Sequence, residues 1–236
     1  MPGKERTGLC GRYAITLPPD AMRSLFGYGE QPNFPPRYNV APTQPVPVVR
    51  MERDADGSFR RHFQLVRWGF LPGFVKDVKA FPLIINARSE TLLEKPSFRN
   101  AIRRRRCLFV MDGYYEWQRH GPKARSQPFL IRRSDAAPMG VAGMWEHLMT
   151  PDGSEIETAC LITVPASRPL AHIHDRMPAV LEPDEFSCWL EPDEREFVAA
   201  LTLLRPAAAE VMSFVAIGEA GNKVGNDGPG LQVPLA

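Results

Sequence analysis

Residues 107–118 read CLFVMDGYYEWQ, a dense run of apolar and aromatic residues. Such residues favour β-strands, because their side chains pack well on a pleated surface. Eight similar runs occur along the chain, at residues 11–16, 46–51, 62–70, 128–133, 140–148, 157–164, 178–181 and 211–217. The 24 prolines and 18 glycines break the chain into short pieces. This pattern predicts an α+β fold: a single domain on a mainly antiparallel, barrel-like β-sheet with flanking short helices.

Helical patterns lie between some of the strand runs. They cover residues 20–26, 97–106, 184–190 and 193–204, and each opens on a Ser or Asp that could cap the first turn. Residues 52–60, ERDADGSFR, predict a hairpin turn, because Asp and Gly supply the backbone angles that a tight turn requires. Apart from residues 1–9 and the tail after Gly218, no linker-like stretch separates two cores.

The composition is that of an ordinary folded protein, with 44% apolar and 24% charged residues among 236 and a net charge of +2. This charge excludes a strongly basic protein, so nucleic-acid binding would need a local cluster of Arg and Lys. Four well-separated cysteines do not suggest a zinc site, and we expect no metal and no cofactor. We see neither a secretory signal nor a membrane-spanning stretch, which predicts a cytoplasmic protein with reduced cysteines.

Five short stretches place polar residues beside rigid or aromatic ones: CGRY at 10–13, RYNVAPT at 37–43, NARSE at 86–90, GYYEW at 113–117 and HIHDRMP at 172–178. In GYYEW, strand alternation puts Glu116 on the face opposite Tyr115 and Trp117. Two interpretations of Glu116 stay open. It is either a solvent-facing carboxylate or a cleft residue, whose pKa desolvation would raise into a useful range for acid or base catalysis.

His174 lies two residues after His172, and such a pair can bind a metal when both side chains share one face of a strand. No third ligand lies nearby, so His174 is either a structural hydrogen-bonding group or a catalytic one. The run RRRR at 103–106 closes a predicted helix and forms either a solvated face or an edge that contacts phosphates. The cysteines that lie in apolar runs are predicted core residues: Cys107, Cys160 and Cys188.

The five stretches, in this order, resemble the SOS response-associated peptidase family, whose members protect abasic sites in single-stranded DNA. The resemblance runs from Cys10 to VGNDGPGLQVP at 224–234. It implies a mature N-terminus at Cys10, with residues 1–9 as a leader that is absent or removed and residues 10–236 as the family domain. We further expect a monomer that binds single-stranded DNA containing abasic sites and associates with the nucleoid when bound.

The resemblance also implies which residues form the site. Asn86, Glu116 and His174 would complete the catalytic site with Cys10. The residues expected at the DNA are Arg12, Arg88 and Arg176 near phosphates and Asn39 in the cleft. Independently of the resemblance, Trp68 or Phe74 could stack on unpaired bases, although Trp68 in VRWGF fits a core position equally well. Where family members can present two bulky aromatics after the PG turn, this chain has Phe74 and Val75.

The predicted function is a sensor and covalent shield of abasic sites, in which Cys10 at the N-terminus forms a thiazolidine crosslink, with associated lyase and self-processing activity. Two alternatives stay open: a peptidase or amidohydrolase with Cys10 as nucleophile and His174 as base, and a non-catalytic single-strand-binding module. Cys10 becomes N-terminal either by cleavage after Leu9 or by translation starting at the codon read as Leu9. We favour the second route, because it needs only ordinary removal of the initiator Met.

Overall fold

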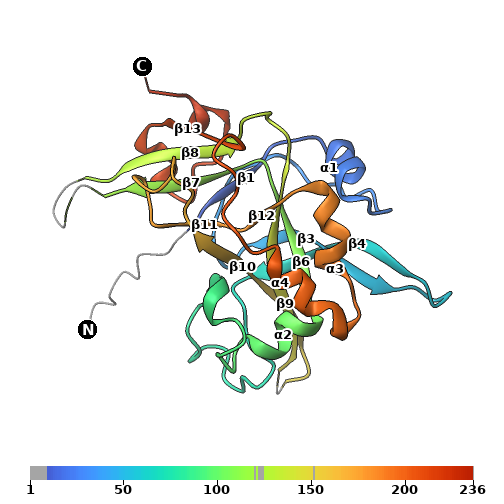
Figure 1. The fold of residues 1–236 in the computed structure, drawn as a ribbon. Helices are drawn as coiled ribbons and strands as arrows, with labels where there is room; N and C mark the ends of the chain where they lie inside the picture. Colours follow the sequence, from blue (N-terminus) through green and yellow to red (C-terminus); the bar gives the residue numbers. More distant parts are fainter. Residues whose placement is uncertain (1–9, 120, 122–124, 151, 236) are drawn as a thin grey trace.

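The computed structural model of the chain describes residues 10–119, 121, 125–150 and 152–235. The predicted leader, residues 1–9, lies outside the described residues. Two β-sheets form the body of the described chain, and short helices flank them (Figure 1). The predicted α+β class, with a mainly antiparallel sheet and short flanking helices, is therefore confirmed.

One of the two sheets closes into a barrel. Its strands are β3 (Pro45–Arg53), β4 (Phe59–Trp68), β6 (Arg106–Met111), β9 (Met139–Met149) and β10 (Glu155–Pro165). Neighbours pair antiparallel in the order β4, β3, β6, β9, β10. β10 then pairs in parallel with β4, where Thr158 lies opposite Arg67, and this pairing closes the ring. The expectation of a barrel-like sheet is confirmed, and closure removes the free edges of these strands.

The second sheet has the strand order β13 (Met212–Ala216), β8 (Gln127–Arg133), β7 (Gly113–Gln118), β1 (Tyr13–Ile15) and β2 (Arg37–Val40). All its neighbours are antiparallel. Residues 107–118 therefore supply one strand to each sheet, β6 to the barrel and β7 to the second sheet, with Asp112 between them. This stretch joins the two sheets around one buried core.

Three short strands extend the barrel beyond its ring. β5 (Asn86–Arg88) lies parallel to β10, with Asn86 opposite Leu161 and Arg88 opposite Thr163. β11 (Arg176–Pro178) lies antiparallel to the same end of β10, with Arg176 opposite Pro165. β12 (Val180–Leu181) pairs with β9. The stretches NARSE and HIHDRMP, far apart in the sequence, thus meet at the C-terminal end of β10.

The helices lie close to their predicted positions, and all but the first are shorter than predicted. They are α1 (Pro19–Phe26), α2 (Arg99–Arg104), α3 (Phe186–Leu190) and α4 (Phe197–Thr202), with single 3-10 turns at Ser89–Thr91, Pro183–Glu185, Glu194–Glu196, Glu219–Asn222 and Pro229–Gln232. Asp193 caps its turn as expected, since its side chain accepts from Arg195 N at 2.8 Å. The expected caps of the first two helices are wrong, because Pro18 and Phe98 stand at those positions and give no side-chain cap.

Arg106 departs from the prediction that the arginine run closes a helix. α2 ends at Arg104, and Arg106 begins β6 with 5% of its surface exposed. Its guanidinium donates to Trp189 O at 2.7 Å and to Ile102 O at 3.0 Å. Both proposed roles of the run, a solvated face or a phosphate-contacting edge, are therefore wrong for Arg106, which ties the barrel to α3.

Two further predictions concern the hairpin and the cysteines. β3 and β4 form the predicted hairpin, whose turn has Gly57 at φ +83°, a value that glycine adopts at little cost. Cys107 and Cys160 are fully buried as predicted, whereas Cys188 is only half-buried. Within the described residues, every helix is too short or too polar to cross a bilayer.

Candidate functional site

Cys10 and Glu116 come together because of the pairing of β1 with β7. Tyr13 lies opposite Tyr114, and Tyr115 N donates to Arg12 O at 2.9 Å, so the chain just before β1 runs past Glu116. Cys10 N donates a hydrogen bond of 3.0 Å to Glu116 Oε2, across 106 positions of sequence. The backbone nitrogen of Cys10 is therefore held directly against a carboxylate.

Glu116 is a buried carboxylate, with 4% of its surface exposed. It shares a face of β7 with Tyr114, and this face looks into the main core, whereas Tyr115 and Trp117 pack on the opposite side. Desolvation raises the pKa of Glu116, and hydrogen bonds from Cys10 N and Trp117 N together with the nearby His174 offset this only in part. The solvent-facing interpretation is wrong, and Glu116 has the environment of a general acid or base.

Cys10 is itself buried, with 1% of its surface exposed. Burial, and then the charge of Glu116, raises the pKa of its thiol well above the ordinary value. Its backbone φ is +35°, in the left-handed region that side chains disfavour. Cys10 thus presents a protonated thiol at neutral pH, in a backbone conformation that carries strain.

His174 precedes β11 and is half-buried, with 25% of its side chain exposed. Its Nδ1 accepts from Arg176 N at 3.0 Å, so the neutral ring carries its proton on Nε2. Asp175 Oδ1 lies 2.9 Å from the same Nδ1. Because His174 lowers the pKa of Glu116, the two groups lie within electrostatic reach of each other. Asn86 is half-buried at the start of β5, on the far side of β10 from Arg176.

The predicted role of Asn39 at the DNA is wrong, because its side chain is buried and holds protein groups. It is 1% exposed, and its amide nitrogen donates to Lys223 O at 3.0 Å and Asn226 O at 2.7 Å. Asn39 Oδ1 accepts from Arg12 Nη1 at 2.8 Å, and Arg12 Nη1 also donates to Gly221 O at 2.8 Å. Asn39 therefore binds the C-terminal segment through hydrogen bonds and holds the guanidinium of the half-buried Arg12 in position.

The other two arginines differ in their freedom to bind DNA. Arg88 is exposed at the end of β5. Arg176 has 9% of its side chain exposed, forms a bidentate ion pair with Glu90 and donates to Thr163 O at 2.6 Å. This pair lowers the pKa of Glu90 to about 2. A phosphate at Arg176 would have to compete with Glu90, whereas Arg88 can meet one directly.

The two aromatic residues predicted to stack on bases differ in their exposure to solvent. Trp68 is fully buried, packs edge-on against Tyr13 at 5.1 Å between ring centroids, and donates to Ile85 O at 3.0 Å. The prediction that Trp68 stacks on bases is therefore wrong, because β4 enters the core at this residue. Phe74 is 60% exposed and packs edge-on against Phe81 at 6.4 Å between ring centroids, while Val75 is 8% exposed.

Three aromatic residues near Cys10 were not among the site residues predicted from the sequence. Trp117 is half-buried, its Nε1 donates to Asn222 Oδ1 at 2.7 Å, and the guanidinium carbon of Arg12 lies 5.9 Å from its ring centroid. Tyr13 and Tyr114 lie on the core face with Glu116. The signal was present in the alternation of GYYEW, which assigns Tyr114 and Glu116 to one face.

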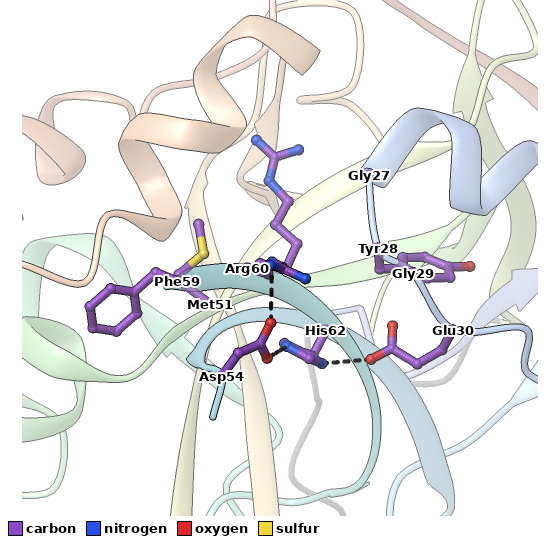
Figure 2. Close-up of a pocket in the computed structure, with 10 residues that line it drawn as sticks. Gly27, Tyr28, Gly29, Glu30, Met51, Asp54, Phe59, Arg60 and His62 are labelled. Carbon is purple, nitrogen blue, oxygen red and sulfur yellow. Dashed lines mark hydrogen bonds and ion pairs between the residues drawn. The ribbon is translucent and has the colours of Figure 1, made fainter. Parts of the chain in front are cut away.

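A separate cavity of about 720 Å³ lies between the end of α1 and the β3–β4 hairpin (Figure 2). It contains none of the predicted site residues. His62 stands in it between two carboxylates, with Nδ1 2.6 Å from Glu30 Oε1 and Nε2 2.8 Å from Asp54 Oδ1. Opposite nitrogens of one ring cannot share a single ion, and the described residues contain no cluster of three or more His, Cys, Asp or Glu that could hold a metal.

Comparisons with known proteins agree on one family. Residues 9–224 match the family described as SOS response associated peptidase (SRAP). The chain is 34% identical over 226 residues to Abasic site processing protein YoqW of Bacillus subtilis, covering 94% of this chain and 98% of that protein. It is 32% identical over 267 residues to Abasic site processing protein HMCES of Gallus gallus, covering 96% of this chain and 78% of that protein.

A crystal structure of a Bacteroides thetaiotaomicron protein has the same fold, with a TM-score of 0.80 and 24% identity over 96% of this chain and 100% of that chain. The family match extends over most of the chain and takes in Cys10, Glu116 and His174. The chain therefore belongs to the SOS response associated peptidase family.

Proposed function

We propose that the protein forms a covalent crosslink with abasic sites in single-stranded DNA through Cys10 as its first residue. The observation that carries the proposal is the 3.0 Å contact between Cys10 N and Glu116 Oε2, because it joins the expected reacting nitrogen to a buried acid-base group. Relatives at 34% and 32% identity that are named abasic site processing proteins support the substrate.

The first step is imine formation. An abasic deoxyribose opens to an aldehyde, with which a neutral amine condenses. An α-amine has a pKa of about 7.7 to 8.0, against about 10.4 for Lys, so near pH 7.4 it is neutral roughly two hundred times more often. The nitrogen of Cys10 adds to the aldehyde carbon, and water leaves as the C=N bond forms. Glu116 accepts a proton from the nitrogen and returns one to the departing hydroxyl.

The second step is ring closure. The Cys10 sulfur attacks the imine carbon and forms an S–C bond, the C=N pair moves to nitrogen, and the thiol proton is transferred to that nitrogen through Glu116. No oxidant or reductant is needed, because the thiol adds across the double bond. The short tether gives the thiol a high effective concentration. The ring removes the imine, which would otherwise permit β-elimination and strand cleavage, the associated lyase reaction.

The strained backbone at Cys10 supports a chain that begins there. A residue in the middle of a chain has a φ angle, and at Cys10 this angle is +35°. A first residue has no φ, so the strain at this position disappears when the peptide bond before Cys10 is absent. The α-amine then replaces an amide nitrogen, which is not basic, at the carboxylate of Glu116.

Arg12, Arg88 and Arg176 would hold the phosphates around the lesion, and Phe74 would stack on an unpaired base. The cysteine-peptidase alternative has less support. Reactive cysteines of proteases have depressed pKa values, whereas burial and Glu116 raise the pKa of the Cys10 thiol. We assign the role of base to Glu116 rather than His174, because Glu116 accepts a hydrogen bond from Cys10 N at 3.0 Å.

The test compares two forms of the protein on an oligonucleotide with one abasic site. One form begins at Cys10, and the other carries Leu9→Pro to block removal of residues 1–9, with mass spectrometry confirming each N-terminus. We expect a heat-stable adduct only with the Cys10-first form, and similar reversible binding to single-stranded DNA by both. Equal adduct formation by the extended form would rule out the α-amine as the nucleophile.

A Cys10→Ala protein with a free N-terminus separates the amine from the thiol. It should form no heat-stable adduct but still cleave the abasic strand slowly, since its amine can make the imine. Heat-stable adducts at the parental rate would assign the reaction to another residue.

A further inference from the structure

Two tyrosine hydroxyls are buried on the side of the second sheet that faces Cys10. Tyr13 on β1 and Tyr114 on β7 lie directly opposite each other, with 0% and 1% of their surfaces exposed. Because directly opposite residues of an antiparallel pair project to the same face, both rings enter the core beside the face of Glu116. Among the described residues, neither hydroxyl has a hydrogen-bond partner.

A buried hydroxyl without a partner destabilises the folded protein, because it loses its hydrogen bonds to water. Phenylalanine has the same shape without this cost, and the sheet would pack equally well with it. Unsatisfied groups of this kind in folded proteins often mark a ligand, a water or a reacting group that supplies the partner. The two hydroxyls therefore point to an acceptor that is present only during function.

The sulfur of Cys10 becomes an acceptor in the proposed reaction, and Cys10 N contacts Glu116, which shares a face of β7 with Tyr114. Tyr13, Tyr114 and Cys10 belong to one buried cluster from which solvent is excluded. Desolvation raises the pKa of both phenols, and a negative charge on the Cys10 sulfur would raise it further. Glu116 adds to the effect on Tyr114, two residues away on the same strand face.

We propose that the Tyr13 and Tyr114 hydroxyls donate hydrogen bonds to the Cys10 sulfur as it becomes a thiolate and closes the thiazolidine ring. The assignment rests on the proposed crosslinking function and deepens it. The phenols keep their protons throughout. The thiol proton passes to Glu116 and then to the ring nitrogen, while the sulfur pair forms the S–C bond and the C=N pair moves to nitrogen.

The charged surroundings explain why such donors are needed. Burial, and then the charge of Glu116 on β7, raises the pKa of the Cys10 thiol and so opposes thiolate formation. His174 lies before β11 and acts on Glu116 together with Arg119, while Arg37 on β2 acts on Tyr13. The causes that act on the pKa of the Cys10 thiol are burial and Glu116, and both raise it. Neutral hydroxyl donors can stabilise a thiolate without placing a further charge in the core.

The test uses Tyr13→Phe, Tyr114→Phe and the double variant in the Cys10-first protein. Tyr28→Phe is the matched control: its hydroxyl is also buried without a partner among the described residues, but it lines the cavity around His62 (Figure 2). Two rates are measured on an abasic oligonucleotide. Borohydride-dependent adduct reports imine formation, and adduct that survives heating without borohydride reports ring closure.

We expect imine formation to stay near the parental rate and ring closure to slow by roughly tenfold or more in the double variant, because hydrogen bonds to charged groups are the stronger ones. The pH at which ring closure is half-maximal should move upward, since the thiolate loses its donors. The three single variants, Tyr13→Phe, Tyr114→Phe and Tyr28→Phe, should have melting temperatures no lower than that of the parent, because each loses an unsatisfied hydroxyl. Tyr28→Phe should leave both rates unchanged.

Ring closure at the parental rate and with the parental pH profile in the double variant would overturn the assignment. An equal loss of imine formation would also overturn it, since the effect would then not be on sulfur. A parent protein that forms neither kind of adduct would refute the proposed function itself, and the assignment with it. These outcomes are distinguishable, because the parent is measured in the same series.

Discussion

Replacing Glu116 with Gln removes a carboxylate while keeping the shape of the side chain. Glu116 Oε2 lies 3.0 Å from Cys10 N, and the side chain is buried, so the amide fits the same place. A positioned acid or base typically contributes about 10²- to 10⁴-fold to a rate. We expect Glu116→Gln to slow adduct formation by about a hundredfold or more near neutral pH. Reversible binding to single-stranded DNA should persist, because the exposed Arg88 and Phe74 are untouched.

The same substitution should stabilise the protein at neutral pH. Desolvation makes the pKa of Glu116 higher in the folded state than its ordinary value of 4.5. The folded protein then binds the proton more tightly than the unfolded chain, so stability falls as pH rises from that value through the raised pKa. Each tenfold difference in proton affinity corresponds to about 1.4 kcal/mol. Glu116→Gln removes this loss, so its free energy of unfolding should vary less with pH than that of the parent.

The assay combines heat-stable adduct on a denaturing gel with urea unfolding, each across neutral pH. Glu30→Gln is the control, because it removes a carboxylate that accepts from Phe63 N and pairs with His62, away from Cys10. It should leave the adduct rate unchanged. If Glu116→Gln forms the adduct as fast as Glu30→Gln does, then Glu116 carries no proton in the reaction, and the proposed mechanism is wrong.

Three further predictions follow from the positions of single residues. Trp68→Ala should destabilise the protein by about 3 to 5 kcal/mol in urea unfolding, because the ring is fully buried. Phe74→Ala should leave stability unchanged and weaken binding to single-stranded DNA by about 1 to 3 kcal/mol. The reverse pattern would contradict a buried Trp68 and a DNA-stacking Phe74. Arg88→Ala should weaken binding regardless of base sequence and reduce the salt dependence by about one counterion, and an unchanged slope in titrations at several salt concentrations would exclude a phosphate contact. Burial disfavours the charged ring of His62, but Glu30 and Asp54 outweigh it and raise its pKa. The stabilisation is present in full below about pH 6.5 and is lost as pH rises through the raised pKa, so His62→Gln should cost about 1 kcal/mol or less in acid and nothing in alkali. An equal cost at both pH values would refute the pairing of charged His62 with Glu30 and Asp54.

The strand pattern was readable because alternation and β-rich composition are local. GYYEW assigned Glu116 to its face, and only the pairing with β1 showed that this face is buried against Cys10. Barrel closure through the parallel pairing of β10 with β4 joins residues about ninety positions apart, such as Arg67 and Thr158, and no local pattern records it.

The wrong predictions for Asn39 and Trp68 also arise from contacts between residues far apart in the sequence. Asn39 looked like a cleft residue, but carbonyls of the C-terminal segment more than 180 positions away occupy its amide nitrogen. Trp68 in VRWGF reads equally as a surface or a core residue, and the loop after β4 decides that it is covered. The unpartnered hydroxyls of Tyr13 and Tyr114 are a property of the packed core, so the sequence shows only that both residues are tyrosines.

The proposed crosslink is tested most directly by mass spectrometry of the adduct between the Cys10-first protein and an abasic oligonucleotide, formed without borohydride. After digestion, we expect the modification on the peptide that begins at Cys10, with the combined mass less one water and no thiol free to react with an alkylating reagent. An adduct on a Lys side chain, or on an N-terminal peptide whose Cys10 thiol still alkylates, would contradict the thiazolidine.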